Sequence, residues 1–241
     1  MESLSIEDNL LKQNIEMVRE RVRVAAEASG RSLEDITILA ATKMQNVTTI
    51  NRAISYGITH IGENRVQELV AKYDGYDKVH ASVQFIGHLQ LNKVMHIVDK
   101  VDMIQSVDSI KLAAEIDKRC AKIGKVMDIL VQVNIGREES KGGVLLEDLQ
   151  QLLIDVSHLQ HVRVRGLMTI PPICENIEQS KQYFSSLYKE FLDIRAKKID
   201  NIYMDFLSMG MSGDYICAVE CGANVIRVGT SVFGSRKKQE D

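Results

Sequence analysis

The sequence has only two prolines among its 241 residues, and no stretch rich in proline, glycine or serine interrupts it. The two prolines, Pro171 and Pro172, are adjacent. Stretches of that composition are typical of linkers, so their absence argues against a division of the chain into several domains. Because a single α/β barrel reaches this length, we expect one domain covering residues 1–241.

An excess of charge of either sign is also missing. Lys and Arg number 30 against 33 Asp and Glu, a formal net charge of −3, so the chain offers no basic field for nucleic acid or for a membrane surface. No apolar run is long enough to cross a bilayer, and the amino-terminal segment is acidic where a signal peptide would be basic. We therefore expect a soluble, cytoplasmic protein that binds neither nucleic acid nor membranes.

Cysteine is scarce, with four residues and no CxxC pair. Cys217 and Cys221 lie four residues apart on a predicted helix and would suit two metal ligands, but no His or carboxylate recurs at ligand spacing. Small core residues are the favoured interpretation of this pair, and the other two cysteines are Cys120 and Cys174. We expect reduced thiols and no metal site.

What the chain does contain is a regular alternation of strand and helix patterns. An amphipathic helix is predicted within residues 1–30, with apolar Leu11, Ile15, Val18, Val22 and Ala25 in steps of four and three. The predicted strands are 35–43, 59–64, 82–88, 102–108, 127–136, 162–170, 203–210 and 224–234. The clearest predicted helices between them are 48–57, 66–74, 109–124, 146–159 and 180–198.

Strands separated by helices run parallel, because a helical crossover returns the chain to the same edge of the sheet. Eight such units predict a single (β/α)8 TIM barrel over residues 35–234, preceded by the extra amino-terminal helix, with a doubly wound open sheet as the alternative. In a barrel of this kind the chemistry lies at the carboxyl ends of the strands. Polar residues at those ends are therefore the candidates for function.

The first predicted strand ends in a lysine. Alternation places Ile36, Ile38 and Ala40 on the face that meets the helices and Lys43 on the opposite face, at the carboxyl end of the barrel interior. Desolvation there would lower the pKa of the amine and make it a nucleophile toward a carbonyl group. Lys43 is thus a candidate for a Schiff base, and a structural lysine paired with a carboxylate is the alternative.

The last predicted strand carries an arginine that should also point inward. Alternation sets Val225 and Arg227 on one face and Ile226 and Val228 on the other. An interior guanidinium is strongly unfavourable unless it is paired. Its partner is either a structural carboxylate such as Asp205 or a heteroatom of a ligand.

Two loops suit a phosphate group. Gly229, Thr230 and Ser231 follow the eighth strand, and the segment SMGMSGDY at 208–215 follows the seventh. Glycines allow a backbone to approach an anion and hydroxyls add donors, although loops of this composition often only turn the chain. Paired at strands seven and eight of a barrel, they predict a phosphate site.

Polar residues also follow other strands. Asn64, His88, Asn92 and Asn134 can each be interpreted as a helix cap or a loop hydrogen bonder, but their shared place at the carboxyl ends indicates a functional rim. A lysine, a ring-nitrogen partner and an anion site together match pyridoxal 5′-phosphate (PLP). A barrel enzyme that forms a lysine Schiff base with a phosphosugar is a more distant alternative.

Seven motifs resemble, in order, those of the YggS/PROSC family of PLP homeostasis proteins. They are ATK at 41–43, GEN-VQE at 62–68, FIGHLQLNK at 85–93, NIGREESKGG at 134–143, RGLMTIPP at 165–172, SMGMSGDY at 208–215 and RVGTSVFGSR at 227–236. The chain departs from the usual family pattern at MQN, residues 44–46, and at Arg65, where a tyrosine is common. Both departures lie near the lysine.

The resemblance implies a barrel similar to the amino-terminal domain of alanine racemase, with PLP as the cofactor. The residues carried over by position are Lys43 for the Schiff base, Arg227 for the pyridine nitrogen, Ser212, Gly229 and Thr230 for the phosphate, and Asn64 and Met168 as pocket neighbours. It also implies a role in vitamin B6 homeostasis and amino-acid metabolism, with PLP buffered or delivered to PLP-requiring apo-enzymes. We expect a monomer.

Catalysis is not expected to be robust. Racemisation by two bases needs an acid or base on each face of the cofactor, and in alanine racemase the second base lies close to an additional domain that we do not find in this chain. An arginine beside the ring nitrogen also disfavours its protonation, which weakens PLP as an electron sink. The sequence therefore predicts a PLP-binding protein, with a PLP-dependent amino-acid racemase or lyase as the alternative.

Overall fold

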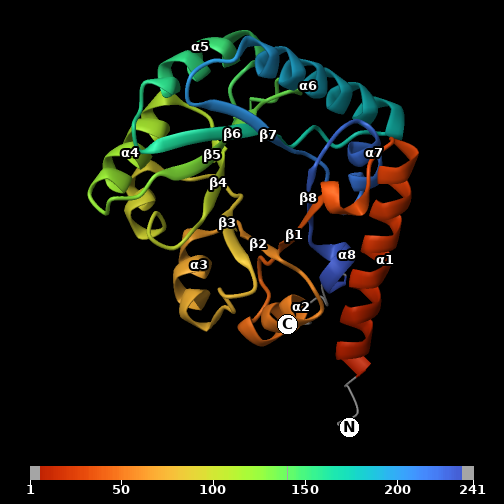
Figure 1. Ribbon diagram of the computed structural model, residues 1–241. Coiled ribbons are helices and arrows are strands. Elements are labelled where there is room, and N and C mark those ends of the chain that lie inside the picture. Colours follow the sequence, from red (N-terminus) through yellow and green to blue (C-terminus); the bar gives the residue numbers. More distant parts are fainter. Residues whose placement is uncertain (1–5, 140, 235–241) are drawn as a thin grey trace.

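The computed structural model describes residues 6–139 and 141–234, in which eight parallel strands close into a barrel (Figure 1). β8 returns to pair with β1, with Leu39 beside Arg227, which confirms the predicted barrel and excludes the open sheet. The strands are β1 Thr37–Ala41, β2 His60–Glu63, β3 Ser82–Phe85, β4 Met103–Val107, β5 Met127–Val133, β6 Val162–Thr169, β7 Ile202–Ser208 and β8 Val225–Val228.

The predicted strands agree with the observed ones in order and position, and β7 begins one residue earlier than predicted. One prediction is wrong at its carboxyl end, because residues 230–233 form the short helix α8 and do not continue β8. The N–H groups of Val232 and Phe233 both donate to the carbonyl of Gly229, at 3.0 and 2.9 Å, and this turns the chain into a helix directly after the strand.

Helices connect most of the strands and cover the outside of the barrel (Figure 1). The helices are α1 Ile6–Ala28, α2 Val47–Ser55, α3 Val66–Lys72, α4 Ile110–Ala121, α5 Leu146–Ser157, α6 Ile177–Lys197, α7 Tyr215–Glu220 and α8 Thr230–Phe233, with 3₁₀ turns at Leu33–Asp35, Tyr73–Gly75 and Leu91–His96. Asn46 caps α2 by accepting from the N–H of Thr49 at 2.8 Å, so the MQN segment ends in a helix cap.

The first helix lies outside the barrel and packs against α7 and α8 (Figure 1). Of its predicted range, residues 1–5 lie outside the described residues, and α1 itself ends at Ala28. The face predicted to be apolar is buried: Leu11, Ile15, Val18, Val22 and Ala25. The barrel elements fall within the predicted range 35–234, while the assignment of residues 1–241 to one domain stays a prediction.

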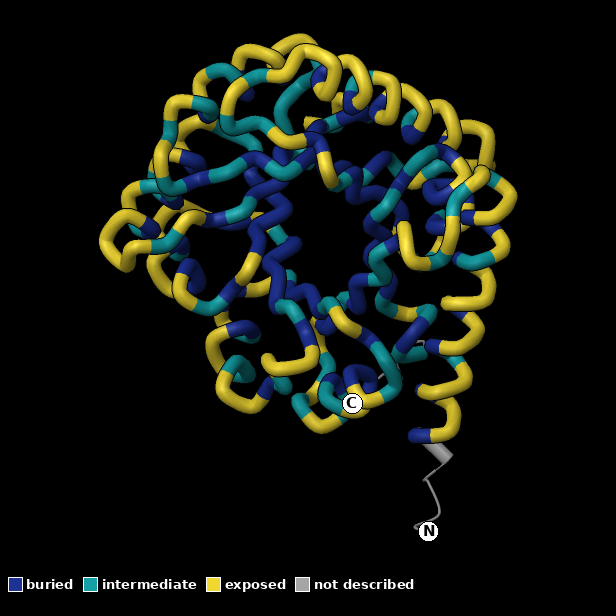
Figure 2. The backbone as a smooth tube through the Cα atoms, viewed as in Figure 1, coloured by how far each residue is buried: buried dark blue, intermediate teal, exposed yellow. Residues whose placement is uncertain are grey.

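Burial follows the barrel geometry, with buried strands surrounded by helices whose outward faces are exposed (Figure 2). Ile36 and Ala40 belong to the large apolar core that also contains the buried faces of the helices. Leu39 packs instead with Ile86 and Val225 in a small cluster within the barrel. The predicted alternation along β1 is therefore confirmed.

The four cysteines are free thiols, and Cys120, Cys217 and Cys221 are buried. Burial raises the pKa of Cys217 to about 12, so its thiol is protonated at neutral pH. Within residues 6–139 and 141–234, no group of three or more His, Cys, Asp and Glu is placed to hold a metal ion. In the same residues, no helix is long and apolar enough to cross a membrane.

The packing of α1 predicts a strong contrast between two neighbouring substitutions. Ile15 is 1% exposed and Met17 is 48% exposed on the same helix. We expect Ile15→Ala to lower the free energy of unfolding by about 3 kcal/mol, because it removes buried methyl groups and leaves a cavity. Met17→Ala should change it by no more than about 0.5 kcal/mol, as surface substitutions usually do. Urea titrations of the two variants measure both values, and equal losses would mean that α1 does not pack as described.

Candidate functional site

A cavity of about 260 Å³ lies at the carboxyl end of the barrel, beside the loops that follow β1, β2, β7 and β8. All but one of the residues predicted to hold a cofactor line it: Lys43, Asn64, Ser212, Arg227, Gly229 and Thr230. Ala41, Ile86, Ile170, Met211 and Gly213 complete the lining. Closure of the barrel is what brings the first and last strands, far apart in the sequence, to one site.

Lys43 lines the cavity from the turn that follows β1, and it is exposed. The prediction that the barrel mouth desolvates this amine is therefore wrong, because the turn carries it beyond the buried strand. The structural alternative is not found either, since within the described part of the chain the Lys43 ammonium forms no ion pair with a carboxylate. The amine thus lines the cavity with no anionic partner among residues 6–139 and 141–234.

Arg227 points into the barrel from β8 and is buried, as predicted. Its Nη1 donates to the Oγ of Ser208 at 2.5 Å, and its Nη2 donates to the carbonyl of Thr169 at 2.7 Å. Burial lowers the pKa of Arg227 to about 10, and the negative charge of Asp214 opposes this shift. The guanidinium is thus charged at neutral pH while its hydrogen-bond partners are neutral oxygens.

Asp205, the structural partner considered for Arg227, lies elsewhere. Its carboxylate is exposed and accepts from Nε of Arg165 at 2.7 Å. Arg165 in turn donates through Nη1 to Asp128 at 2.7 Å. The carboxylate therefore belongs to an ion-pair network that joins β5, β6 and β7, and of the two alternatives for Arg227 the pairing with Asp205 is not found.

Behind Arg227 a chain of hydrogen bonds crosses the barrel interior. The Oγ of Ser208 donates to Oε1 of Gln105 at 2.7 Å, and Nε2 of Gln105 donates to Oε1 of Gln84 at 2.6 Å. All three side chains are buried. None of the three was predicted from the sequence, although a glutamine at an inward position of the apolar strands SVQF and MIQSV was a usable signal.

The predicted phosphate loops are joined in the structure. The N–H groups of Gly229 and Ser231 both donate to the Oγ of Ser212, at 3.1 and 3.2 Å, and the Ser231 hydroxyl donates to the Ser212 carbonyl at 3.3 Å. Because the Ser212 oxygen already accepts two bonds, its hydroxyl hydrogen is free to point elsewhere. The hydroxyl of Thr230, on the exposed side, adds a second donor to the lining.

Asn64 and Met168 have different surroundings. Asn64 lines the cavity, and its Oδ1 is buried without a hydrogen-bond partner among the described residues. This oxygen can therefore accept a hydrogen bond from a ligand in the cavity. Met168 is fully buried in a cluster with Met103 and Leu130 and is not among the residues that line the cavity. Its predicted place beside a cofactor stays a prediction.

A second compartment of about 560 Å³ adjoins the first and shares Asn64, Ile86 and Ile170 with it. His88, a candidate of the sequence analysis, lines this compartment together with polar residues of the loop after β5. Asn134 lies in the same loop and organises it, because its Nδ2 donates to the carbonyl of Glu138 at 2.9 Å. Asn92 lines a third, neighbouring hollow with His88.

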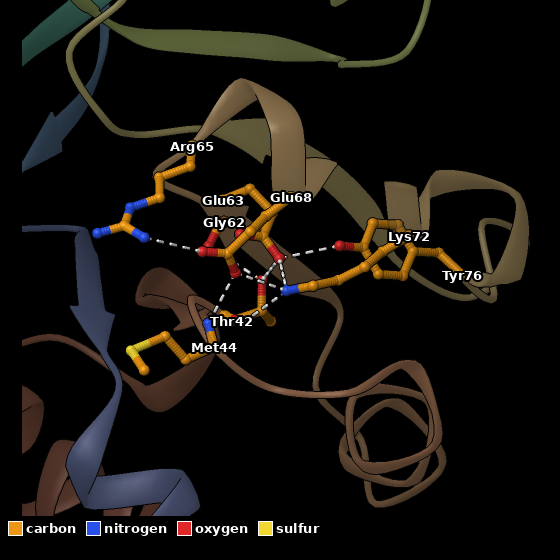
Figure 3. A network of polar contacts seen from close by, with 8 residues as sticks. All are labelled: Thr42, Met44, Gly62, Glu63, Arg65, Glu68, Lys72 and Tyr76. Carbon is orange, nitrogen blue, oxygen red and sulfur yellow. Dashed lines mark hydrogen bonds and ion pairs between the residues drawn. The ribbon is translucent and has the colours of Figure 1, made fainter. Parts of the chain in front are cut away.

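The turn that carries Lys43 rests on a group of polar side chains, which we call the Lys72 cluster: Thr42, Glu63, Glu68, Lys72 and Tyr76 (Figure 3). Glu63 is fully buried, and its Oε1 accepts from Thr42 Oγ1 at 2.8 Å, Tyr76 Oη at 2.9 Å and Lys72 Nζ at 3.0 Å. Burial, with the Glu63 charge, raises the pKa of Tyr76 well above its ordinary value. The sequence analysis did not predict this cluster.

Comparison with known proteins places these features in a family. The family model described as alanine racemase, N-terminal domain, matches residues 11–237. A pyridoxal phosphate homeostasis protein of Aquifex aeolicus is 41% identical over 225 residues, which are 93% of this chain and 98% of that protein.

Two solved structures are similar to this chain over most of its length. PipY of Synechococcus elongatus, solved with PLP bound, is 32% identical, with a TM-score of 0.78 over 90% of this chain and all of that one. An unknown protein from Bifidobacterium adolescentis is also 32% identical, with a TM-score of 0.91 over 97% of this chain and 98% of that one. This chain therefore belongs to the YggS/PROSC family of pyridoxal phosphate homeostasis proteins, whose barrel corresponds to the N-terminal domain of alanine racemase.

Proposed function

We propose that this protein binds PLP and buffers or delivers it in vitamin B6 homeostasis, and thereby influences amino-acid metabolism. The observation that carries the proposal is that Lys43, Arg227 and the two phosphate loops, predicted separately from the sequence, line one cavity. The relatives support it, since they are named pyridoxal phosphate homeostasis proteins and PipY was solved with PLP.

The residues of the cavity fit this ligand. Among the described residues that line it there are two cations, Lys43 and Arg227, and no carboxylate, so the lining favours an anion such as a phosphate ester. Ile86 and Ile170 supply apolar walls for an aromatic ring. Ser212 and Thr230 supply hydroxyl donors, and Gly229 contributes backbone without a side chain to the lining.

Each residue has a distinct task in this proposal. When bound, PLP would supply an aldehyde, a group toward which a lysine amine is a nucleophile. Lys43 holds that end of the ligand, and Ser212, Gly229 and Thr230 hold the phosphate. Arg227 would hold the ring nitrogen, Asn64 and Met168 would be its neighbours, and residues 1–241 would act as one PLP-binding domain.

The site favours binding over catalysis. Arg227 has only donors and stays charged, so it opposes protonation of a ring nitrogen placed against it and keeps PLP a weak electron sink. Neither Tyr203 of β7 nor Tyr215 of α7 lines the cavity, so neither is placed to act as an opposing base. Apo-enzymes as recipients, a monomeric state and a cytoplasmic location complete the proposal.

The first prediction concerns Lys43. Borohydride treatment of the PLP-loaded protein should leave a pyridoxyl-phosphate adduct on Lys43, located by peptide mass mapping, because its amine lines the cavity. Lys43→Ala should lose the visible absorbance band and keep its unfolding transition, since the residue is exposed and contributes little to the core. Lys111→Ala, an exposed lysine at the same end of the barrel, should keep the band. An adduct found on another lysine alone would refute the assignment.

The second prediction concerns the phosphate loops. Replacing Ser212 and Thr230 together by alanine should weaken binding of PLP more than binding of unphosphorylated pyridoxal. Hydrogen bonds to a charged group are stronger than neutral ones, so each hydroxyl should contribute about 1–3 kcal/mol to PLP binding alone. Titrations of both compounds measure the difference, and an equal loss for the two would argue against a phosphate site in these loops.

The third prediction separates a carrier from a racemase or lyase. PLP-loaded protein incubated with L-alanine, L-serine or L-threonine in deuterated water should exchange α-protons slowly or not at all, because Arg227 opposes the charge build-up on the ring. The same protein should reactivate an apo-aminotransferase. Rapid exchange that disappears in Lys43→Ala would show that an enzyme has been missed. The visible absorbance band of PLP held by Lys43 also separates PLP from a phosphosugar ligand, which would give no such band.

A further inference from the structure

The backbone on both sides of Lys43 is held by side chains from β2 and α3. Residues 42–45 form a turn in which the N–H of Gln45 donates to the carbonyl of Thr42 at 3.0 Å. On the far side of Lys43, the N–H of Met44 donates to Oε2 of Glu68 at 2.8 Å (Figure 3). The orientation of Lys43 therefore depends on contacts made by its two neighbours.

The conformation of the turn is one that needs such support. Met44 has φ of 63°, in the left-handed region that residues other than glycine rarely adopt. A backbone of this kind persists where the surrounding structure fixes it. The carboxylate of Glu68 fixes it here, because an N–H bound to a charged acceptor resists rotation of the peptide.

Lys72 holds this carboxylate in place. Its three ammonium protons have three acceptors: Oε1 of Glu63 at 3.0 Å, Oε2 of Glu68 at 2.9 Å and the carbonyl of Thr42 at 3.4 Å. The Lys72 ammonium thus connects the buried Glu63 to Thr42, the residue before Lys43. It also connects Glu63 to Glu68, whose carboxylate binds the N–H of Met44, the residue after Lys43. Since its side chain is only 15% exposed, water competes little for these bonds.

The electrostatics agree with this arrangement. Partial burial by itself would raise the pKa of Glu68, but the hydrogen bond from Met44 and the ammonium of Lys72 outweigh it and lower the pKa below the ordinary value. Arg65 adds little, because its Nη1 is 3.8 Å from the other oxygen of Glu68 and its side chain is 73% exposed. The Glu68 carboxylate is therefore ionised, and it accepts a hydrogen bond from the N–H of Met44 in the turn.

We propose that Glu68, held by Lys72, is a positioning residue that fixes the turn 42–45 and so aims the amine of Lys43 at the cavity. The inference rests on the proposed function, in which Lys43 holds the aldehyde of PLP. Glu68 itself does not line the cavity, so it acts through the backbone of Met44 and not by touching the ligand.

The test uses Glu68→Ala, Glu68→Gln and a matched control, Glu115→Ala. Glu115 pairs with Arg119 four residues along α4, as Glu68 pairs with Lys72 along α3, and the two glutamate side chains are 20% and 21% exposed. Amide hydrogen exchange at Met44 is measured on the protein without PLP. Affinities are then measured for PLP and for pyridoxine 5′-phosphate, which has the ring and the phosphate but no aldehyde to react with Lys43.

In Glu68→Ala, exchange at Met44 should accelerate by about tenfold or more and the affinity for PLP should fall by about tenfold, as expected for one lost hydrogen bond to a charged group. The affinity for pyridoxine 5′-phosphate should stay within about twofold, because the remaining cavity is intact. Glu68→Gln keeps an oxygen acceptor and should recover most of both effects. Glu115→Ala should change none of the three measurements.

An unchanged Met44 exchange rate in Glu68→Ala, or an equal loss of affinity for the two compounds, would overturn the inference, since the second result is what a general structural role produces. Failure of the proposed function looks different: the wild-type protein would then bind no PLP and give no borohydride adduct. In that case the exchange rates at Met44, measured without any ligand, still decide whether Glu68 fixes the turn.

Discussion

The inside of this barrel depends on a buried arginine that is held by neutral oxygens. A guanidinium has only donors, so each neighbour of Arg227 must present an acceptor, and Ser208 and Thr169 do so. The hydroxyl hydrogen of Ser208 then has to point to Gln105, whose amide must turn its nitrogen toward Gln84. One charge on β8 thereby sets the orientation of side chains on β7, β4 and β3, and an apolar replacement at any step leaves a buried group unpaired.

This polar interior is compatible with a stable fold because stability is supplied elsewhere. The large core that contains the buried faces of the helices is apolar and contains most of the buried side chains. Within the barrel, two small apolar clusters, around Leu39 and around Met168, accompany the polar chain. The carboxyl ends of the strands are thus free to carry charged and strained groups, such as Met44 with its positive φ, that a core would not tolerate.

Strand and helix periodicity was sufficient to predict the barrel, and alternation within the first and last predicted strands was sufficient to place Ile36, Ala40 and Arg227 on the correct faces. Periodicity could not predict where a strand stops. The prediction that Lys43 is desolvated and the prediction that β8 extends to residue 234 were therefore wrong. It also says nothing about contacts between elements. Asp205 stayed open as a partner of Arg227 for that reason. The Lys72 cluster was missed because it joins β2, α3 and the turn after β1 through side chains of ordinary surface type.

The two ends of the cavity differ in their access to solvent, and this difference bears on how a ligand would leave. Arg227 is 3% exposed and held from two sides, so a group bound to it is fixed by the rigid barrel. Lys43 is exposed on a turn, where another amine can approach from solvent.

A ligand that must be handed to an acceptor is best held with its reactive end outward and its other end inside, because exchange at the reactive end then needs no opening of the barrel. An enzyme gains from the opposite arrangement, since exclusion of water from the reacting atoms strengthens the interactions that stabilise a transition state. The placement of the lysine therefore favours a carrier over a catalyst independently of the ring-nitrogen argument.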